Sequence, residues 1–471
     1  MRAALPSPTE SIALVAALFA TGCAELSSPA PIPTLSIGVV DANVWTGDPE
    51  RPLVEAIGVA GDRVAALGSS DAIRALATDA IIIDADGATV VPGFIDAHVH
   101  LLDAGHRLLA DSTGDALLLD DDFWPVAPEP PPAYTPAEDD AALDAALAYL
   151  AERGVTSVHH MGSWSDLEAL GRARDSGRLT VRVYAAVPLP TWRRLRDAIA
   201  DGRFGGDDGR GDNWLRVGAL KGVVDGTVET GTAALDRPYP DSADDRGLML
   251  YDVDRLSAQV DAADAAELQV ALHAVGSRAN HLALNAYERV IAANGPRDRR
   301  FRIEHAQHLR PDDIARFAAL DVIASMQPAG IGDTGPRLEA MVGSAALAEP
   351  FPVRSLLDTG AVVAFGTNWG FAPAGPILGL YGAVTRRPLE AFYRSSWTPS
   401  ERITIARALN AYTIAGAYAS FEDRIKGRLA IGQLADFAVL DLALLSVPLP
   451  DVRLASVVVT VTGGRIVYDA R

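Results

Sequence analysis

The residues of this sequence best suited to chemistry are histidines and a lysine that stand at the ends of apolar, strand-like runs. His98 and His100 close the run "GFIDAHVHLL" two positions apart, so on a strand both rings point the same way. His273 ends "VALHAVG", His305 ends "FRIEH", and Lys221 interrupts the apolar run "LRVGALKGVVDG". Two imidazoles on one face can share a metal ion. A lone histidine at a strand end is usually a hydrogen-bonded core residue, but four histidines and one lysine at strand ends indicate a joint site.

The elements that must position these residues alternate along the centre of the chain. Helical patterns such as "PAEDDAALDAALAYLAERG" fall between most of the apolar runs. Eight strands with helical crossovers predict a (β/α)₈ TIM barrel, an α/β fold whose chemistry lies at the carboxyl ends of the strands. A doubly wound open sheet is the alternative, but no Gly-rich phosphate loop follows the first run to support it. The expected strands are residues 94–99, 155–159, 180–187, 215–224, 268–273, 301–305, 321–326 and 361–366.

Both flanks of the centre are rich in short β pieces separated by turn residues. The pieces "SIGVV" and "AIGVAGDRVAALG" precede the first barrel strand, and "FAVLD" and "SVVVTVTGGRIVYD" follow the last helical pattern. We therefore expect one small β-sandwich built from both ends of the chain. The expected boundaries are a signal peptide at 1–23, a linker at 24–34, sandwich segments at 35–91 and 425–471, and the barrel at 92–424.

The amino-acid composition limits the classes of molecule that the protein could bind. The chain has 471 residues, of which 49% are hydrophobic, and a formal net charge of −20. Such an excess of negative charge argues against nucleic acid, because nothing balances the phosphates. One cysteine excludes an internal disulfide framework and a cysteine-based zinc site. We expect a small-molecule substrate; the oligomeric state stays open, and a homodimer is compatible with the sequence.

The N-terminus has the pattern of an export signal. Arg2 precedes an apolar stretch at 12–20, then Thr-Gly-Cys and a Ser/Pro-rich segment. The stretch is too short to span a bilayer as a helix and fits the core of a secretory signal. Cys23, at the expected cleavage point, resembles the lipidated cysteine of a bacterial lipoprotein, which would anchor the protein in the cell envelope and make lipid its one link to the membrane. Ordinary secretion to the periplasm with an incidental cysteine, and no export, are the alternatives.

The motifs together resemble a known family. "PGFIDAHVHL", "ALKGVVDGT", "HAVGSRAN", "RIEHAQHL" and "ASMQP", in this order, are similar to the amidohydrolase superfamily, in particular to its family 3 branch, which contains N-substituted formamide deformylases. The C-terminal "KGRLAIGQLADFAVLD" is similar to that branch as well. The resemblance spans roughly residues 36–470, and the ordered set is far more specific than the H-x-H motif alone.

The resemblance implies a binuclear metal centre, usually of zinc. His98 and His100 would bind one ion, and His273 and His305 the other. Lys221 would bridge them as a carbamate formed with CO₂, since an ammonium cannot act as a ligand. Such a centre lowers the pKa of a bound water and polarises a substrate carbonyl. The implied function is metal-dependent hydrolysis of C–N bonds in amide or formamide-type, non-peptide substrates, with a carboxylate or formate and an amine as products.

Two departures from the family pattern bear on activity. Where the family has an aspartate, commonly in "GSDWP", this chain has "GTNWG" with Asn368. That aspartate ligates a metal and accepts the proton of the attacking water; Asn368 cannot accept a proton at neutral pH, and loss of a general base typically costs about 10²–10⁴-fold in rate. In addition, the long substrate-covering insert that the family carries between the positions of His106 and Asp115 is largely missing.

Other residues are candidates to complete the site. His160 is the preferred replacement acid or base, because its unperturbed pKa lies near neutrality, and Glu229 in "DGTVETGTA" is a second. Asp225 resembles a family loop residue that organises the substrate site, and Trp369, next to Asn368, is a candidate substrate contact with core packing as its alternative. A different class of function also stays open: a weakened or inactive, surface-anchored binding protein on an amidohydrolase fold. Metal content would discriminate between the two.

Overall fold

The computed structural model describes residues 34–110, 134–240, 242–329, 331–343, 350–389 and 395–471. Thr34–Arg471 forms one compact unit. The expected signal peptide, Cys23 and nearly all of the expected linker lie outside the described residues. Within the described part of the chain, no helix is long and apolar enough to cross a membrane.

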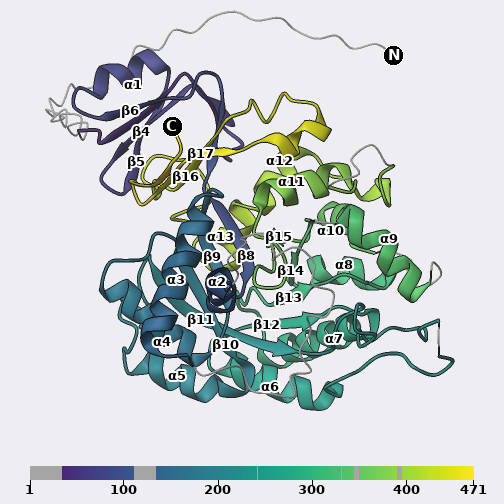
Figure 1. Cartoon of the computed structure of the whole chain (residues 1–471). Helices are drawn as coiled ribbons and strands as arrows, with labels where there is room; N and C mark the ends of the chain where they lie inside the picture. The colour runs from purple at the N-terminus through teal and green to yellow at the C-terminus, as the bar shows by residue number, and fades with distance from the viewer. Residues whose placement is uncertain (1–33, 111–133, 241, 330, 344–349, 390–394) are drawn as a thin grey trace, which may run out of the picture. The chain divides into compact units, whose positions relative to one another are not determined.

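The centre of the chain is a barrel of eight parallel strands, in the same order in space as in sequence (Figure 1). This confirms the predicted (β/α)₈ fold. Most residues of these strands are apolar and buried, as expected for strands covered by helices on one face and by the barrel interior on the other. The strands are β8 (Phe94–Val99), β9 (Val155–Met161), β10 (Arg182–Pro188), β11 (Leu215–Val223), β12 (Gln269–Ala274), β13 (Arg302–His305), β14 (Ile323–Met326) and β15 (Val363–Phe365).

The barrel is closed between its first and last strands by the segment that follows β15. The Asn368 amide donates to the carbonyl oxygen of His98 at 2.8 Å, and the His100 amide donates to that of Trp369 at 2.7 Å. These bonds fix the end of the last strand beside the two histidines that end the first. Sequence positions almost 270 apart therefore meet at one rim, at the carboxyl ends of the strands.

Helices connect successive strands, and several begin with strong caps. In α3, Thr135 and Glu138 form a reciprocal capping box with Pro136 in the first turn, and in α4 Ser163 and Asp166 form another. The helices of the unit are α1 (Ser70–Leu76), α2 (Leu101–Ala110), α3 (Pro136–Ala151), α4 (Trp164–Asp175), α5 (Trp192–Ala200), α6 (Val253–Ala265), α7 (Ser277–Asn294), α8 (Pro311–Ala319), α9 (Ile331–Val342), α10 (Val353–Asp358), α11 (Pro376–Thr385), α12 (Ile405–Ala411) and α13 (Ile414–Ala419), with 3₁₀ turns η1 (Leu189–Thr191), η3 (Pro399–Glu401) and η4 (Leu449–Leu454).

Two further sheets are built from the two ends of the chain. The four-stranded sheet has the order β5-β4-β1-β6, and the six-stranded sheet has the order β18-β17-β16-β7-β2-β3, in which C-terminal β16 pairs antiparallel with N-terminal β7. The domain boundaries expected from the sequence stay predictions. The strands are β1 (Ile37–Val40), β2 (Asn43–Trp45), β3 (Leu53–Val54), β4 (Ala56–Ala60), β5 (Arg63–Gly68), β6 (Ile81–Asp84), β7 (Thr89–Pro92), β16 (Phe437–Leu440), β17 (Val457–Thr462) and β18 (Arg465–Asp469).

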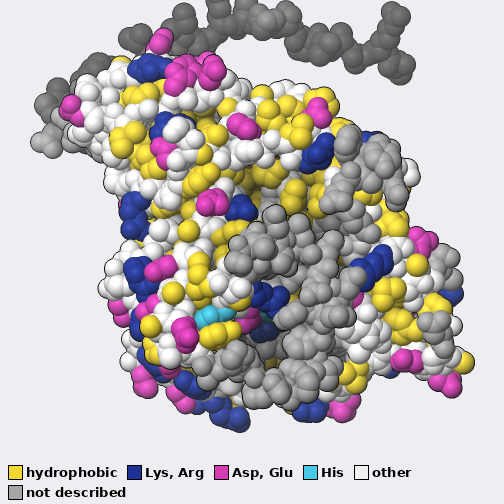
Figure 2. Space-filling model, in the orientation of Figure 1, with side chains coloured by type: hydrophobic (Ala, Val, Ile, Leu, Met, Phe, Trp, Pro, Cys, Tyr) yellow, Lys and Arg dark blue, Asp and Glu magenta, His cyan; other side chains and the backbone are white. Residues whose placement is uncertain are grey.

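Charged side chains of both signs are mixed over the surface. On the face shown in Figure 2, Lys and Arg are interspersed with Asp and Glu, and the described residues form no continuous basic area there.

Candidate metal centre

The structure brings the five predicted ligands together at the carboxyl ends of β8, β11, β12 and β13. The ring centroids of His98 and His100 are 5.5 Å apart, those of His98 and His305 are 4.9 Å apart, and those of His273 and His305 are 4.4 Å apart. The Nζ atom of Lys221 lies 3.3 Å from Nε2 of His98. The grouping therefore matches the sequence-based expectation, whereas the ligand roles themselves stay predictions.

Two of the imidazoles have their tautomer fixed by a partner on Nδ1. In His98, Nδ1 donates to the carboxylate Oε2 of Glu304 at 2.7 Å. In His305, Nδ1 donates to the amide Oε1 of Gln327 at 2.9 Å. A ring nitrogen that donates a proton leaves the lone pair on the other nitrogen, so both residues keep their lone pair on Nε2.

The other two histidines differ from this pair. In His273, Nε2 donates to the carbonyl oxygen of Gly226 at 3.1 Å, which places the lone pair on Nδ1. The ring of His100 packs edge-on against Phe371, with centroids 4.7 Å apart. One donor–acceptor pattern therefore holds for three of the four rings: one nitrogen is a proton donor to a protein oxygen, and the other keeps its lone pair.

Burial keeps all four imidazoles neutral. Removal from water lowers the pKa of each histidine below its ordinary value, and the nearby Lys221 lowers it further; for His273 the pKa falls to about 3. Burial likewise lowers the pKa of Lys221 to about 8. Neutral imidazole is the form that binds metal ions. A cluster of four uncharged rings beside a lysine is therefore chemically suited to a cation.

The donor set fits a divalent metal in its chemistry. Among the described residues, no three His, Cys, Asp or Glu side chains converge closely enough to hold an ion as they stand. Imidazole nitrogens suit zinc and related ions, and Lys221, which lies beside His98, supplies oxygen ligands only after carbamylation. A contribution of Lys221 to a coordination shell stays a prediction.

Two residues of this rim have a left-handed backbone conformation. His305, at the end of β13, has φ of +77°, and Asn368 has φ of +59°. Positive φ is uncommon for residues other than glycine, although asparagine tolerates it, and such strain clusters at functional sites. The His305 conformation turns the chain out of the strand at the point where its ring joins the cluster.

These features lead to one family. The model of the amidohydrolase family matches residues 103–468, most of the chain, beginning just after His98 and His100. The chain belongs to the amidohydrolase family. Amidohydrolases are metal-dependent hydrolases that act on carbon–nitrogen bonds, which agrees with the rim described above and with the resemblance seen in the sequence motifs.

Proteins similar to this amidohydrolase occur in a plant, a bacterium and an archaeon. It is 30% identical to the protein LONG AFTER FAR-RED 3 of Arabidopsis thaliana over 94% of this chain and 93% of the plant protein. It is 25% identical to the N-substituted formamide deformylase of Arthrobacter pascens over 86% and 93% of the two chains. The crystal structure of an uncharacterized metal-dependent hydrolase from Pyrococcus furiosus is similar in fold, with a TM-score of 0.70, 22% identity, and coverage of 86% and 98%.

The alignment with the Arabidopsis thaliana protein also compares the lengths of the two chains. It extends over 553 positions, more than the 471 residues of this chain, so the plant protein has residues without a counterpart in this amidohydrolase. This agrees with a missing insert. Its expected place after His106 falls partly on 111–133, outside the described residues, and stays a prediction.

The position of Asn368 is set by a buried carboxyl that sequence reasoning missed. Asp96, in β8, accepts hydrogen bonds from the amides of Thr367 at 2.9 Å and His98 at 3.2 Å, and from the Thr367 hydroxyl. Asp96 thus fixes the segment that holds the half-buried Asn368 to the strand that ends in His98. Its signal in the sequence is alternation, because Asp96, His98 and His100 share one face of the strand.

His160 lies next to the cluster but both of its ring nitrogens have partners. Nδ1 accepts from the Leu101 amide at 3.1 Å, and Nε2 donates to Asp166 Oδ2 at 3.1 Å. The side chain is 2% exposed and links β9 to the first turns of α2 and α4. Its role as acid or base stays a prediction that this geometry does not favour, since a general base needs a lone pair directed at the reacting water.

Of the three remaining candidates, two are buried and one is exposed. Asp225 is fully buried and accepts bonds of 2.8–2.9 Å from three backbone amides of the loops after β11 and β12, so it organises these loops. Trp369 is fully buried and stacks on Tyr149 at 4.8 Å, which supports the packing alternative. Glu229 is exposed. Substrate contacts of Asp225 and Trp369 stay predictions that burial does not favour.

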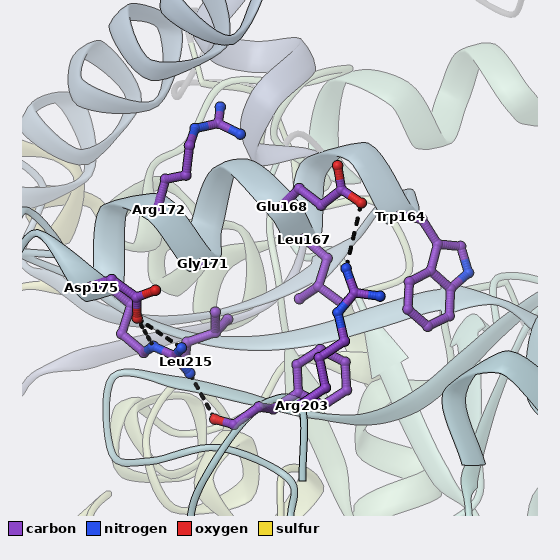
Figure 3. Close-up of a pocket in the computed structure, with 10 residues that line it drawn as sticks. Trp164, Leu167, Glu168, Gly171, Arg172, Asp175, Arg203 and Leu215 are labelled. Carbon is purple, nitrogen blue, oxygen red and sulfur yellow. Dashed lines mark hydrogen bonds and ion pairs between the residues drawn. The ribbon is translucent and has the colours of Figure 1, made fainter. Parts of the chain in front are cut away.

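One surface cavity lies elsewhere. A hollow of about 310 Å³ runs along α4 and is lined by Trp164, Glu168, Arg203 and Phe204 among others (Figure 3). In Figure 3 the Arg203 guanidinium points to Glu168, an ion pair of 3.5 Å. None of the predicted site residues lines this cavity, so it is separate from the candidate metal centre.

Proposed function

We propose that this amidohydrolase hydrolyses a C–N bond in small amide or formamide-type substrates with a bound divalent metal, most simply zinc. The supporting observation is the buried group of four neutral imidazoles and one lysine, with three ring tautomers fixed by protein acceptors. The name of the Arthrobacter pascens relative supports formamides as the first substrate class to test.

The residues of the site would have different roles in metal binding. His98, His100, His273 and His305 would hold the metal, with Lys221 as a carbamate whose two oxygens are anionic. A bound divalent ion would polarise the substrate carbonyl and lower the pKa of an attacking water. Glu304 and Gln327 hold two of the rings in the ligating tautomer.

Proton transfer is the step of hydrolysis for which the site has the fewest suitable residues. Asn368 has an amide that can accept or donate a hydrogen bond but cannot take a proton at neutral pH. Glu229 is the exposed carboxylate among the candidates, on the loop after β11, and is the base we would mutate first; His160, with both nitrogens engaged, is the second.

The proposal is tested by metal content and then by turnover. Protein purified without chelator should contain one or two zinc ions per chain by plasma mass spectrometry, and zinc-loaded protein should release amine from N-formyl amines. Glu229→Gln should then lower turnover without changing the zinc content. A well-folded protein that neither contains nor takes up divalent metal would overturn the proposal.

A second candidate function is a binding protein on the same fold. Asn368 favours it, because the proton acceptor of the family pattern is absent at this position. Its signature would be substrate analogues that bind without turnover at any metal loading. Detectable, metal-dependent release of amine would exclude it.

We also propose that the protein is exported and anchored through lipid on Cys23. Cys23→Ala should then shift the protein from the membrane fraction to the soluble fraction, and metabolic labelling with a radioactive fatty acid should be lost. Equal membrane association of both proteins would overturn the anchor.

A further inference from the structure

The barrel interior beneath the candidate centre holds a fully buried ion pair. Arg302 and Glu304 both come from β13, two positions apart, and both are 0% exposed. Arg302 Nε lies 2.8 Å from Glu304 Oε1, and Arg302 Nη2 donates to Glu304 Oε2 at 3.2 Å. The same Oε2 accepts from Nδ1 of His98 at 2.7 Å. A continuous path of contacts therefore runs from the guanidinium through the carboxylate to a predicted ligand.

The guanidinium is held from three other strands. It donates to the carbonyl oxygen of Ala97 at 2.6 Å, to Nδ1 of His159 at 2.7 Å and to the hydroxyl of Ser325 at 3.2 Å. These partners lie in β8, β9 and β14. Because a planar guanidinium with this many partners cannot turn, it fixes the carboxylate plane of Glu304. The carboxylate in turn fixes the ring of His98.

Charge favours the same arrangement. The Arg302 guanidinium contacts both carboxylate oxygens of Glu304, at 2.8 and 3.2 Å, and so pairs a buried anion with a buried cation. An anionic acceptor on the far nitrogen makes an imidazole a stronger ligand. Asn368 contributes no negative charge to the rim. The carboxylate of Glu304, which contacts His98, therefore has a larger share in the attraction of a cation.

We propose that Glu304, held by Arg302, is a positioning residue: it orients His98 with Nε2 toward the metal and thereby sets the metal affinity of the centre. This inference rests on the proposed metal-dependent function. It goes beyond that function because neither residue would contact the metal or the substrate. Removal of such a partner typically lowers metal affinity about 10–100-fold.

The same barrel contains a matched control. Lys426 and Glu422 form another buried pair, 2.8 Å apart and 2% and 6% exposed, and Lys426 donates to the hydroxyl of Ser157. Glu422→Gln removes a buried carboxylate from an ion pair, as Glu304→Gln does, but this pair has no histidine hydrogen-bonded to it among the described residues. A purely structural role of Glu304 therefore predicts that the two variants behave alike.

The test compares zinc affinity by competition with a chromophoric chelator in wild type, Glu304→Gln, Glu422→Gln and the double variant Arg302→Met/Glu304→Gln. The double variant removes both charges, and so remains informative if the single variant leaves Arg302 unpaired and fails to fold. We expect zinc to bind about 10–100-fold more weakly in both Glu304 variants and with unchanged affinity in Glu422→Gln. The absorption spectrum of the cobalt-substituted protein should shift in the Glu304 variants alone.

Three results would overturn the inference. Wild-type zinc affinity in a folded Glu304→Gln, or in the double variant, would remove the positioning role. An equal loss in Glu422→Gln would show that any buried carboxylate has this effect. If wild type binds no zinc, the proposed metal-dependent function is wrong, and this inference is wrong with it. That outcome differs from failure of the inference alone, in which wild type binds zinc and the Glu304 variants bind it equally well.

Discussion

Restoring a carboxylate at Asn368 is the substitution that most directly tests the chemistry. Asn368→Asp keeps the size of the side chain and suits the backbone, because aspartate, like asparagine, tolerates the observed φ of +59°. The bond from the residue 368 amide to the carbonyl oxygen of His98, 2.8 Å, does not involve the side chain and is retained. The substitution therefore changes charge and proton affinity with little change in shape.

The expected gain follows from the role of a general base. A positioned base typically contributes about 10²–10⁴-fold to the rate, or about 3–5 kcal/mol of activation free energy. The position is half-buried and adjoins the segment clamped by Asp96, so the new carboxylate is held at the rim rather than free in solvent. Its negative charge should also strengthen metal binding, since the four predicted imidazole ligands are neutral.

The assay is amine release from N-formyl and N-acetyl amines by zinc-loaded protein, with zinc content measured on the same samples. Asn285→Asp is the matched control, because Asn285 is another half-buried asparagine, on α7, with Arg316 as its partner. Asn368→Asp should raise turnover by at least about 100-fold over wild type, and Asn285→Asp should not. If Asn368→Asp is folded and fully loaded yet no faster than the control, the view that residue 368 limits proton transfer is wrong.

Three further predictions concern metal, stability and pH. Lys221→Ala should lose at least one metal ion per chain by elemental analysis, and unchanged stoichiometry would refute a bridging role. Arg182→Met should destabilise the fold by about 3–5 kcal/mol in urea unfolding, because it leaves buried Asp436 without its bidentate partner (2.7 and 3.0 Å); a loss below about 1 kcal/mol, typical of exposed pairs, would contradict this. Burial lowers the pKa of His308 from 6.5 to about 4, so the unfolded chain binds a proton between these values that the folded protein does not, and stability falls as pH drops from 6.5 toward 4 by up to about 3 kcal/mol. His308→Gln should remove this part of the pH dependence of the free energy of unfolding. If the difference in stability between the variant and wild type is constant between pH 4 and 7, His308 does not cause the loss.

Most of the barrel was accessible to sequence reasoning because most of its strands are apolar runs bounded by turn residues. The run expected at 94–99 is β8, and the run expected at 268–273 is β12 within one residue at each end. The pairing of the terminal sheets was not accessible. Strand β1 lies between β4 and β6, parallel to one and antiparallel to the other, and only contacts distant in sequence decide this order.

The site was accessible only in part, and the reason is the range of the interactions. The placement of the histidines at one rim of the barrel could be predicted from the sequence, because the position of a residue in its strand decides the rim at which its side chain lies. The engagement of His160 could not, since its Nδ1 partner is the amide of Leu101, 59 residues away. Glu304 did leave a signal: in "FRIEH" an acid and a base alternate within a buried strand, and buried charges need partners.

The buried groups at the centre bear on whether metal binding persists despite Asn368. Buried ion pairs such as Arg302–Glu304 often stabilise a fold no more than apolar residues of similar size would, and four neutral imidazoles beside a lysine lose hydration on burial. Packing alone therefore gives no energetic reason to place these groups together, whereas a bound cation does, because it compensates the desolvated nitrogens and the carboxylate behind them. Asn368 affects a different step, the acceptance of a proton. Metal binding and turnover can thus separate in this chain, and zinc-loaded protein with slow hydrolysis, accelerated by Asn368→Asp, is the combination that the geometry favours.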